Sequence, residues 1–266
     1  MSSTAPGAVP AHSTEMSAPA ANPNARVYRG VWSAVRPLDA DTSFYQVRLD
    51  AGANGAAAGL EFRPGQFVQI YKNADPTQRS RAYSIASTPA QLPLLDFCIK
   101  RFPGGLLSAY LETVKVGDPV TLKGPFGRFI LRDAHVAVAS DQPIVLVATG
   151  TGIAPIRSIL NSLLERKPDA KVQLVHGARH ETGLYFHDEI EQLTRAHPGC
   201  ACSCTCSQPS TAWQGATGYV TDVLSNAKLN LEAEYFLCGS PAVVRSTSLL
   251  LRERGVPLER IHIEKW

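Results

Sequence analysis

The seven residues RAYSIAS, 81–87, combine side chains that could do chemistry in a segment whose pattern otherwise predicts a β-strand. Arg81 carries a permanent positive charge, Tyr83 a phenol ring, and Ser84 and Ser87 hydroxyl groups. Packing in a protein core does not by itself explain such a mixture in so short a stretch. The segment is therefore a candidate functional site, and the rest of the chain must indicate what it serves.

A glycine-rich turn, GTGIAP at 150–155, directly follows an apolar run at 144–149 and opens a predicted helix. Glycines let the backbone approach a ligand closely, and the free N–H groups of a helix N-terminus suit a pyrophosphate. Pro155 fits the first helical turn, where its missing N–H would have no partner. A tight turn without a ligand has the same pattern, so both interpretations stay open. The third glycine of the usual dinucleotide-binding fingerprint is absent, so we expect the details of binding to differ.

Other candidate residues follow the ends of predicted parallel strands, where ligands bind in open α/β sheets. Cys238 and Gly239 end the run EYFLCG, and the Cys238 thiol could belong either to the core or to a ligand site. Ser207 and Gln208 end a cysteine-rich run, and Arg179 follows the run KVQLVHGA. Arg179 could hold a ribose or a phosphate.

Two sequence patterns divide the chain near residue 138. Short alternating runs broken by Gly and Pro predict an antiparallel β-barrel over 26–138, with one helix inserted at 105–115. Over 139–266, apolar strands alternate with helical segments, which is typical of a doubly wound parallel sheet. The fold class expected is therefore an antiparallel β-barrel followed by an α/β doubly wound domain.

Composition excludes several classes of protein. Hydrophobic residues make up 44% of the chain and charged residues 18%, and no run of about 18 apolar residues predicts a membrane span. Residues 1–25 contain Glu15 as their one charged residue and are rich in Ala, Pro, Ser and Thr, so we expect a disordered tail and not a targeting signal. The expected location is the cytoplasm, with no membrane association.

Charge is unevenly divided between the two halves. Residues 26–138 hold 14 Lys/Arg and 9 Asp/Glu, whereas residues 139–266 hold 12 and 13. The basic half could steer an acidic protein partner, although random variation of a solvated surface gives the same pattern. Nothing approaches the basic density of a nucleic-acid binder.

Four of the six cysteines alternate along CACSCTC, residues 200–206. Strand geometry would place all four thiols on one face, with the outer two about 20 Å apart, so they cannot share one metal ion. The spacing also differs from iron–sulfur motifs. We expect these thiols to fill a core. The seven histidines show no metal-ligand spacing, and no metal site is predicted.

Taken together, these motifs resemble the ferredoxin–NADP reductase family of FAD-dependent oxidoreductases. The resemblance extends over about 240 of the 266 residues, and the motifs stand in the family's order: RAYSIAS, GGLLS at 104–108, KGPFG at 123–127, GTGIAP, YFLCGSP at 235–241 and a Glu-x-aromatic ending. It implies that the barrel binds FAD and that the parallel-sheet domain binds NAD(P)H. It also implies electron exchange with a separate ferredoxin or flavodoxin, because no fused iron–sulfur domain is evident.

The resemblance implies roles for individual residues in FAD binding. Arg81 would pair with the FAD pyrophosphate, for which a bidentate guanidinium is suited. Tyr83 would stack on the isoalloxazine, and Ser84 would lie beside flavin N5. Backbone groups of Ile99 and Lys100 would line the flavin. At the start of the inserted helix, the pyrophosphate would be cradled by Gly105, Leu107 and Ser108.

Roles in nucleotide binding and catalysis follow in the same way. The nucleotide pyrophosphate would be held by the glycine-rich turn, at Gly150, Thr151, Gly152 and Ile153. Cys238, next to Gly239, would lie under the nicotinamide, and Glu264 would complete the hydride-transfer pocket with Ser84. Trp266 would cover the flavin face and would have to swing away during turnover.

Nucleotide choice depends on Ser207, Gln208 and Arg179. Family members that prefer NADPH often have an arginine where this chain has Gln208, and glutamine cannot replace that charge. Arg179 could still contact a 2′-phosphate. We expect a slight preference for NADH.

Two other functions compete with the ferredoxin–NAD(P)+ reductase hypothesis. One is a free-flavin or quinone reductase, against which GGLLS and Trp266 argue because they imply a retained FAD. The other is an accessory electron-transfer subunit that binds flavin without turning over NAD(P)H. The set Ser84, Cys238 and Glu264 argues against that alternative.

Overall fold

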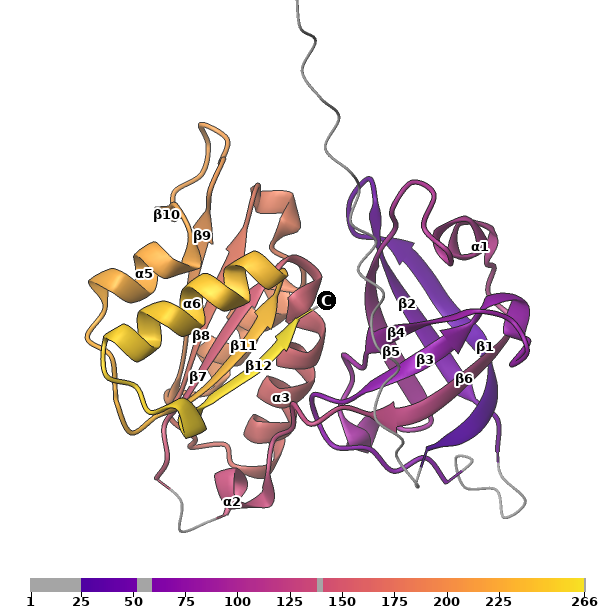
Figure 1. The fold of residues 1–266 in the computed structure, drawn as a ribbon, viewed down its shortest axis with the longest axis horizontal. Helices are drawn as coiled ribbons and strands as arrows, with labels where there is room; N and C mark the ends of the chain where they lie inside the picture. The colour runs from indigo at the N-terminus through magenta and orange to yellow at the C-terminus, as the bar shows by residue number, and fades with distance from the viewer. Residues whose placement is uncertain (1–24, 52–58, 138–140, 266) are drawn as a thin grey trace, which may run out of the picture.

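An antiparallel sheet curls into a nearly closed barrel in the N-terminal half of the computed structural model, which describes residues 25–51, 59–137 and 141–265 (Figure 1). Within these residues the sheet has six strands in the order β4-β3-β6-β1-β2-β5. The segment after β4 approaches β5, where the Ala86 N–H donates to the Asp96 carbonyl at 2.8 Å. The strands are β1 (Arg26–Pro37), β2 (Thr42–Leu49), β3 (Phe67–Tyr71), β4 (Ser80–Ser84), β5 (Leu94–Lys100) and β6 (Pro119–Phe126).

Alternating side chains of these strands fill the barrel. Trp32 and Tyr45 meet edge to face with ring centroids 5.4 Å apart, and both are fully buried. The Tyr45 hydroxyl donates to the Leu111 carbonyl of α1 (Ser108–Thr113) at 3.1 Å and so ties this helix to the barrel. The helix is shorter than the 105–115 predicted, because Gly104 has φ +70° and Val114 returns to extended backbone.

A parallel sheet forms the C-terminal half, in the order β10-β9-β8-β7-β11-β12 across the part of the chain that the structure describes. Its strands are β7 (Ile144–Thr149), β8 (Val172–Ala178), β9 (Cys200–Cys206), β10 (Ala216–Thr217), β11 (Glu234–Gly239) and β12 (Ile261–Lys265). The chain runs from β7 outward through β8 and β9, then returns to the other side of β7 with β11 and β12. The strand order therefore reverses at β7, whose carboxyl end leads into GTGIAP.

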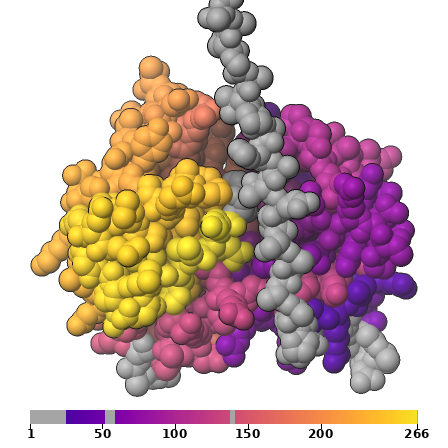
Figure 2. All heavy atoms as spheres, in the orientation of Figure 1, coloured from indigo at the N-terminus to yellow at the C-terminus, as the bar shows by residue number. Residues whose placement is uncertain are grey.

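Helices cover both faces of this sheet, as in a doubly wound fold. Helices α3 (Ile153–Arg166) and α4 (His187–Ala196) cover one face, and α5 (Val220–Asn226) and α6 (Pro241–Glu253) cover the other (Figure 1). Strand β7 is apolar on both sides, because Leu146 packs on the face that α3 and α4 cover and Val147 on the face that α5 and α6 cover. In Figure 2, α6 and the last described residues (yellow) form the near face of this domain.

The remaining elements are short. Helix α2 (Asp133–Val136) lies between β6 and β7 in the chain, where the barrel leads into the parallel-sheet domain. Neither this helix nor β10 was predicted. The 3-10 segments are η1 (Lys72–Ala74), η2 (Pro89–Gln91), η3 (Gly150–Gly152), η4 (Glu181–Gly183) and η5 (Leu258–Arg260). Among the described residues, the helices are too short or too polar to cross a bilayer.

Three sequence predictions fall wholly or partly outside the described residues. The proposed tail over 1–25 lies there except for its last residue, and so does Trp266. The division between 138 and 139 falls within the undescribed residues 138–140. The domain limits therefore remain predictions.

The prediction that the β9 cysteines fill a core holds for only part of the set. Cys200 and Cys206 are buried, but Cys202 and Cys204 are half-buried. The two ends of this cysteine face are therefore packed in the core, whereas its middle, where His187 of α4 contacts Cys204, stays partly accessible.

Candidate functional site

A cavity of about 1190 Å³ opens at the carboxyl edge of the parallel sheet, between the two halves of the chain. The barrel contributes Asp39, Asp41 and Lys100 to its wall. The parallel-sheet domain contributes most of the remaining lining, including the predicted residues Gly150, Arg179, Ser207 and Gln208. The structure thus brings together residues that follow three different strands.

Two glycine-containing loops meet at this edge. A Cβ on Gly152 would lie 2.5 Å from the Cys238 carbonyl oxygen, and one on Gly239 would lie 2.3 Å from Thr149 Oγ1. Neither position has room for a side chain, so the GTGIAP backbone lies directly against the end of β11. Gly150 has φ +54° with open space where its Cβ would be, so its backbone can face a ligand.

The far end of the cavity is built by the loops after β8 and β9. The Gln208 N–H donates to the Arg179 carbonyl at 2.8 Å, which keeps these two residues adjacent. Tyr219, 64% exposed, also lines the cavity. Sequence reasoning missed Tyr219, although an aromatic residue directly before a helix N-terminus at this edge is a signal that could have indicated it.

The RAYSIAS segment presents its cation to solvent and its ring to the barrel. Arg81 is exposed, and its Nη1 donates to the Ser80 carbonyl at 3.2 Å. Tyr83 packs on the barrel core, and burial raises the pKa of its phenol although Arg81 opposes this. Ser84 ends β4 opposite Phe67. An uncovered guanidinium beside a half-buried ring fits an anionic ligand with a flat ring system.

The predicted cradle before α1 is a closed turn. The Ser108 hydroxyl accepts the Phe102 N–H at 2.9 Å, and the Gly105 N–H donates to the Phe102 carbonyl at 2.8 Å. Three predicted ligand-binding residues, Leu107, Ile99 and Ile153, have buried side chains, so they can serve a ligand only through their backbone.

The predicted catalytic residues come from both halves of the chain. Cys238 and Glu264 are Cα partners on β11 and β12, whereas Ser84 belongs to the barrel. Burial raises the pKa of the Cys238 thiol, and Glu264 raises it further. Desolvation raises the pKa of Glu264 to about 7. A carboxyl group at the carboxyl edge of the sheet is therefore suited to hold or release a proton near neutral pH.

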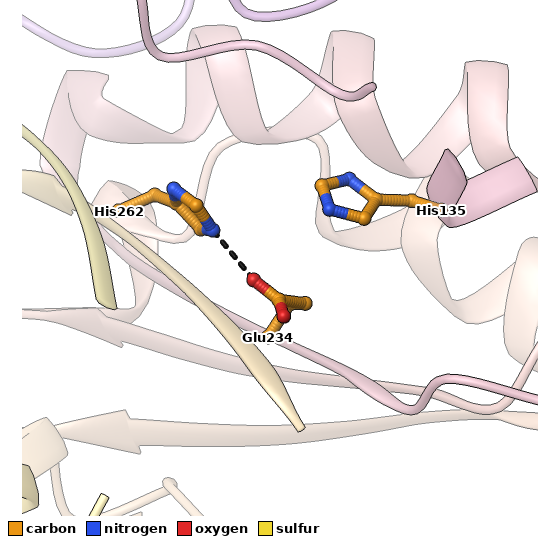
Figure 3. Close-up of side chains that lie close together, drawn as sticks. All are labelled: His135, Glu234 and His262. Atoms are coloured by element: carbon orange, nitrogen blue, oxygen red, sulfur yellow. Dashed lines mark hydrogen bonds and ion pairs between the residues drawn. The ribbon is translucent and has the colours of Figure 1, made fainter. Parts of the chain in front are cut away.

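A second polar cluster lies at the opposite edge of the sheet. His135 of α2, Glu234 of β11 and His262 of β12 point toward one another (Figure 3), with ligand atoms within 4.8 Å. His262 Nε2 and Glu234 Oε2 are 2.7 Å apart, and Arg260 binds Glu234 Oε1 at 3.0 Å. Sequence spacing did not reveal this group, because its members are about 100 and 28 residues apart.

The hydrogen bonds of this cluster favour an anchor for α2 over a metal site. The Arg132 N–H donates to His135 Nδ1 at 3.1 Å, so the neutral ring carries its proton on Nε2, the nitrogen that faces Glu234. Burial lowers the pKa of His135, which favours the neutral ring, although Glu234 opposes this. A metal ion would need that nitrogen unprotonated and would compete with Arg260 for the carboxylate.

Comparisons with known proteins agree with this arrangement. The model of the oxidoreductase FAD-binding domain matches residues 33–130, and that of the oxidoreductase NAD-binding domain matches residues 146–248. The chain is 33% identical to ferredoxin–NADP reductase B of Sorangium cellulosum, over 88% of this chain and 95% of that protein. It is 31% identical to the toluate 1,2-dioxygenase electron transfer component of Pseudomonas putida, over 90% of this chain and 67% of that protein.

A solved structure shows the same fold. The cytochrome P450 reductase GcoB of Amycolatopsis superposes with a TM-score of 0.80 at 27% identity, over 91% of this chain and 70% of that one. The chain spans just over half, 56%, of the propane 2-monooxygenase reductase component of Rhodococcus jostii, to which it is 32% identical.

Proposed function

The chain belongs to the oxidoreductase family that joins an FAD-binding domain to an NAD-binding domain, and from that premise we propose that it is a ferredoxin–NAD(P)+ reductase. It would transfer hydride between NAD(P)H and FAD and exchange single electrons with a separate ferredoxin or flavodoxin. The observation that carries the proposal is the cavity at the carboxyl edge of the sheet, which residues of both halves line. We take residues 26–138 as the FAD-binding domain and 139–266 as the NAD(P)-binding domain.

The residues present fit FAD on the barrel. Arg81 is an exposed cation beside the half-buried ring of Tyr83, so these two would bind a pyrophosphate and a flat ring. Bound FAD supplies the exchange between two-electron and one-electron chemistry. The backbone around Ile99, Lys100, Gly105, Leu107 and Ser108 would complete the FAD site.

The residues that line the cavity, together with those beside it at the ends of β11 and β12, fit a nicotinamide nucleotide. The open backbone at Gly150, with Thr151, Gly152 and Ile153, would hold its pyrophosphate at the start of α3. Cys238 and Gly239 would bound the nicotinamide end, where Glu264 would hold a proton on its carboxyl group and Ser84 would orient the flavin side. Arg179, Ser207 and Gln208 would bind the adenosine end.

The electron carrier and the location are inferred from the named relatives, the charge balance and the state of the thiols. The toluate and propane relatives are named as components of oxygenase systems, so the ferredoxin of such a system is one candidate acceptor. The basic balance of residues 26–138 suits an acidic carrier. All six cysteines are free thiols, which suits a reducing compartment such as the cytoplasm.

Anaerobic reduction of the purified holoprotein by NADH and by NADPH tests the proposal. We expect retained FAD, rapid bleaching of the flavin band by one nucleotide, and subsequent reduction of an added ferredoxin. Loss of the flavin during purification would favour a free-flavin or quinone reductase. A retained flavin that neither nucleotide reduces would favour an accessory subunit.

Gln208→Arg is expected to shift nucleotide choice toward NADPH. A charge-assisted hydrogen bond to the 2′-phosphate is worth about 1.5 kcal/mol or more, so KM for NADPH should fall roughly tenfold while KM for NADH changes little. Steady-state kinetics with both nucleotides measures this. Gln214→Arg adds the same charge at an exposed residue outside the cavity lining and serves as the control. An equal response of the two variants would show that Gln208 does not face the 2′-position.

A further inference from the structure

Two half-buried thiols lie together in the middle of β9, on the face that α4 covers. Cys202 Sγ and Cys204 Sγ are 3.7 Å apart. The other four cysteines of the chain are each at most 6% exposed. Accessibility alone therefore separates Cys202 and Cys204 from the remaining thiols.

A base and an orienting carboxylate extend this pair. His187 Nδ1, at the first residue of α4, lies 3.7 Å from Cys204 Sγ. One helical turn later, Glu191 Oε1 lies 3.4 Å from His187 Nε2. The carboxylate thus faces one ring nitrogen and the thiol faces the other, which is the order found where a histidine activates a nucleophile.

The neighbouring groups leave His187 in the position of proton acceptor. His176, the Cα partner of Cys204 on β8, is fully buried, and burial lowers its pKa to about 3, so it stays neutral. Neither ring nitrogen of His176 has a hydrogen-bond partner among the described residues. Arg195 binds Glu191 Oε2 at 2.7 Å and fixes the carboxylate. The hydrogen bond from Cys202, together with the His187 ring, lowers the pKa of the Cys204 thiol to about 7.

We propose that Cys204 is a thiolate nucleophile, activated by His187, that exchanges with small disulfides, and that Cys202 is its resolving thiol. This site is separate from the hydride-transfer site, because it lies under α4 and contributes no residue to the cavity lining. It gives two of the four alternating cysteines of β9 a chemical role that electron transfer does not require.

The reaction proceeds in two balanced steps. Cys204 loses its proton to His187 and attacks one sulfur of the disulfide RSSR, so that a Cys204–S–SR bond forms and RS⁻ leaves. Cys202 then attacks the Cys204 sulfur, a second RS⁻ leaves, and the protons of the two cysteines pass to the two leaving thiolates. Two protein thiols are oxidised to one disulfide while RSSR is reduced to two RSH. Residues two apart on a strand lie about 6.6 Å apart at Cα, within the range that a disulfide spans.

Reaction of the reduced holoprotein with the aromatic disulfide DTNB at pH 7 tests this proposal. We expect a fast phase that releases two equivalents of thionitrobenzoate and leaves a Cys202–Cys204 disulfide, identified by peptide mass spectrometry. Cys202→Ser should stop after one equivalent, with the adduct on Cys204. Cys204→Ser should lose the fast phase.

His187→Gln separates activation from simple exposure. Lowering a thiol pKa by two units raises the thiolate fraction at pH 7 about 50-fold, and the lower nucleophilicity offsets roughly eightfold of this, which leaves a net gain of about sixfold. Because His187 supplies part of the shift and Cys202 the rest, the variant should react more slowly by up to about sixfold. His197→Gln, at the other end of α4, should react like the unaltered protein. An unchanged rate in His187→Gln, or DTNB label spread over all the cysteines, would overturn the proposal. Circular dichroism and flavin content establish that each variant is folded.

Discussion

Replacing Arg157 with methionine is expected to lower the free energy of unfolding by about 3 to 5 kcal/mol, because it leaves a buried carboxylate without its counter-charge. Arg157 lies on α3, and its Nη1 donates to Asp96 Oδ2 on β5 at 3.0 Å. The two side chains are 11% and 4% exposed. Methionine keeps the length and the apolar contacts of the side chain but not its charge.

Arg157 also makes contacts that the methionine would lose. Its Nη1 donates to the Ala86 carbonyl at 2.9 Å, and its Nε donates to Glu189 at 2.9 Å. The guanidinium lies over the Phe186 ring, 4.8 Å from the centroid. One side chain thus joins the barrel, α3 and α4, so its loss should also change how the two domains face each other.

Chemical denaturation of the holoprotein measures this effect, with two companion variants. Arg166→Met on the same helix removes a surface arginine, 49% exposed and paired with Asp133, and should change stability by less than about 1 kcal/mol. Combining Arg157→Met with Asp96→Asn removes the unpaired carboxylate charge and should recover part of the lost free energy of unfolding. If Arg157→Met lowered the free energy of unfolding no more than Arg166→Met does, the Arg157–Asp96 ion pair would not stabilise the contact between the domains.

The contact between Arg157 and the barrel also explains the second half of RAYSIAS, to which the sequence analysis gave no role. The Ala86 carbonyl accepts from Arg157, and the Ser87 carbonyl accepts from the Ser158 hydroxyl at 2.7 Å. The motif therefore presents Arg81 and Tyr83 at one end and holds the NAD-binding domain at the other. Its last residues connect the FAD side of the molecule to the helix that follows GTGIAP.

Local patterns could predict both sheets, because strand alternation and βα repetition depend on residues that are close together in the sequence. The position of Gly150 at the carboxyl end of β7 followed from the same patterns, since parallel strands end at a common edge. Contacts between distant residues could not be predicted this way. Asp96 and Arg157 are 61 residues apart, and nothing near either one indicates its partner. The position of His187 over Cys204 likewise depends on how α4 docks on β9.

Burial was the other property that alternation did not predict. The alternating cysteines were expected to fill a core, but Cys202 and Cys204 in the middle of β9 stay partly accessible. Likewise, the register of β11 and β12 sets Glu264 beside Cys238, and only the resulting desolvation raises the pKa of Glu264 to about 7. The residue types were visible in the sequence, whereas their protonation depends on packing.

Arg81→Ala is expected to weaken FAD binding roughly 100-fold. Two charge-assisted hydrogen bonds to a pyrophosphate together contribute about 3 kcal/mol, which corresponds to that factor in Kd. Arg81 is exposed, and the carbonyl that accepts its hydrogen bond belongs to the adjacent residue Ser80, so its removal should leave the fold unchanged. Titration of the flavin-free protein with FAD, followed by flavin fluorescence, measures the affinity.

Two companion variants separate a specific pyrophosphate contact from a general loss of positive charge. Arg81→Lys keeps the charge but not the paired N–H donors, so it should recover only part of the affinity. Arg48→Ala removes an exposed arginine from β2 of the same barrel and should bind FAD normally. Because Debye screening weakens distant charges, a purely electrostatic effect would appear in both alanine variants and fade with salt. A loss confined to Arg81, and retained at high salt, would instead identify direct contact with the cofactor, whereas an unchanged Kd in Arg81→Ala would remove this residue from the FAD site.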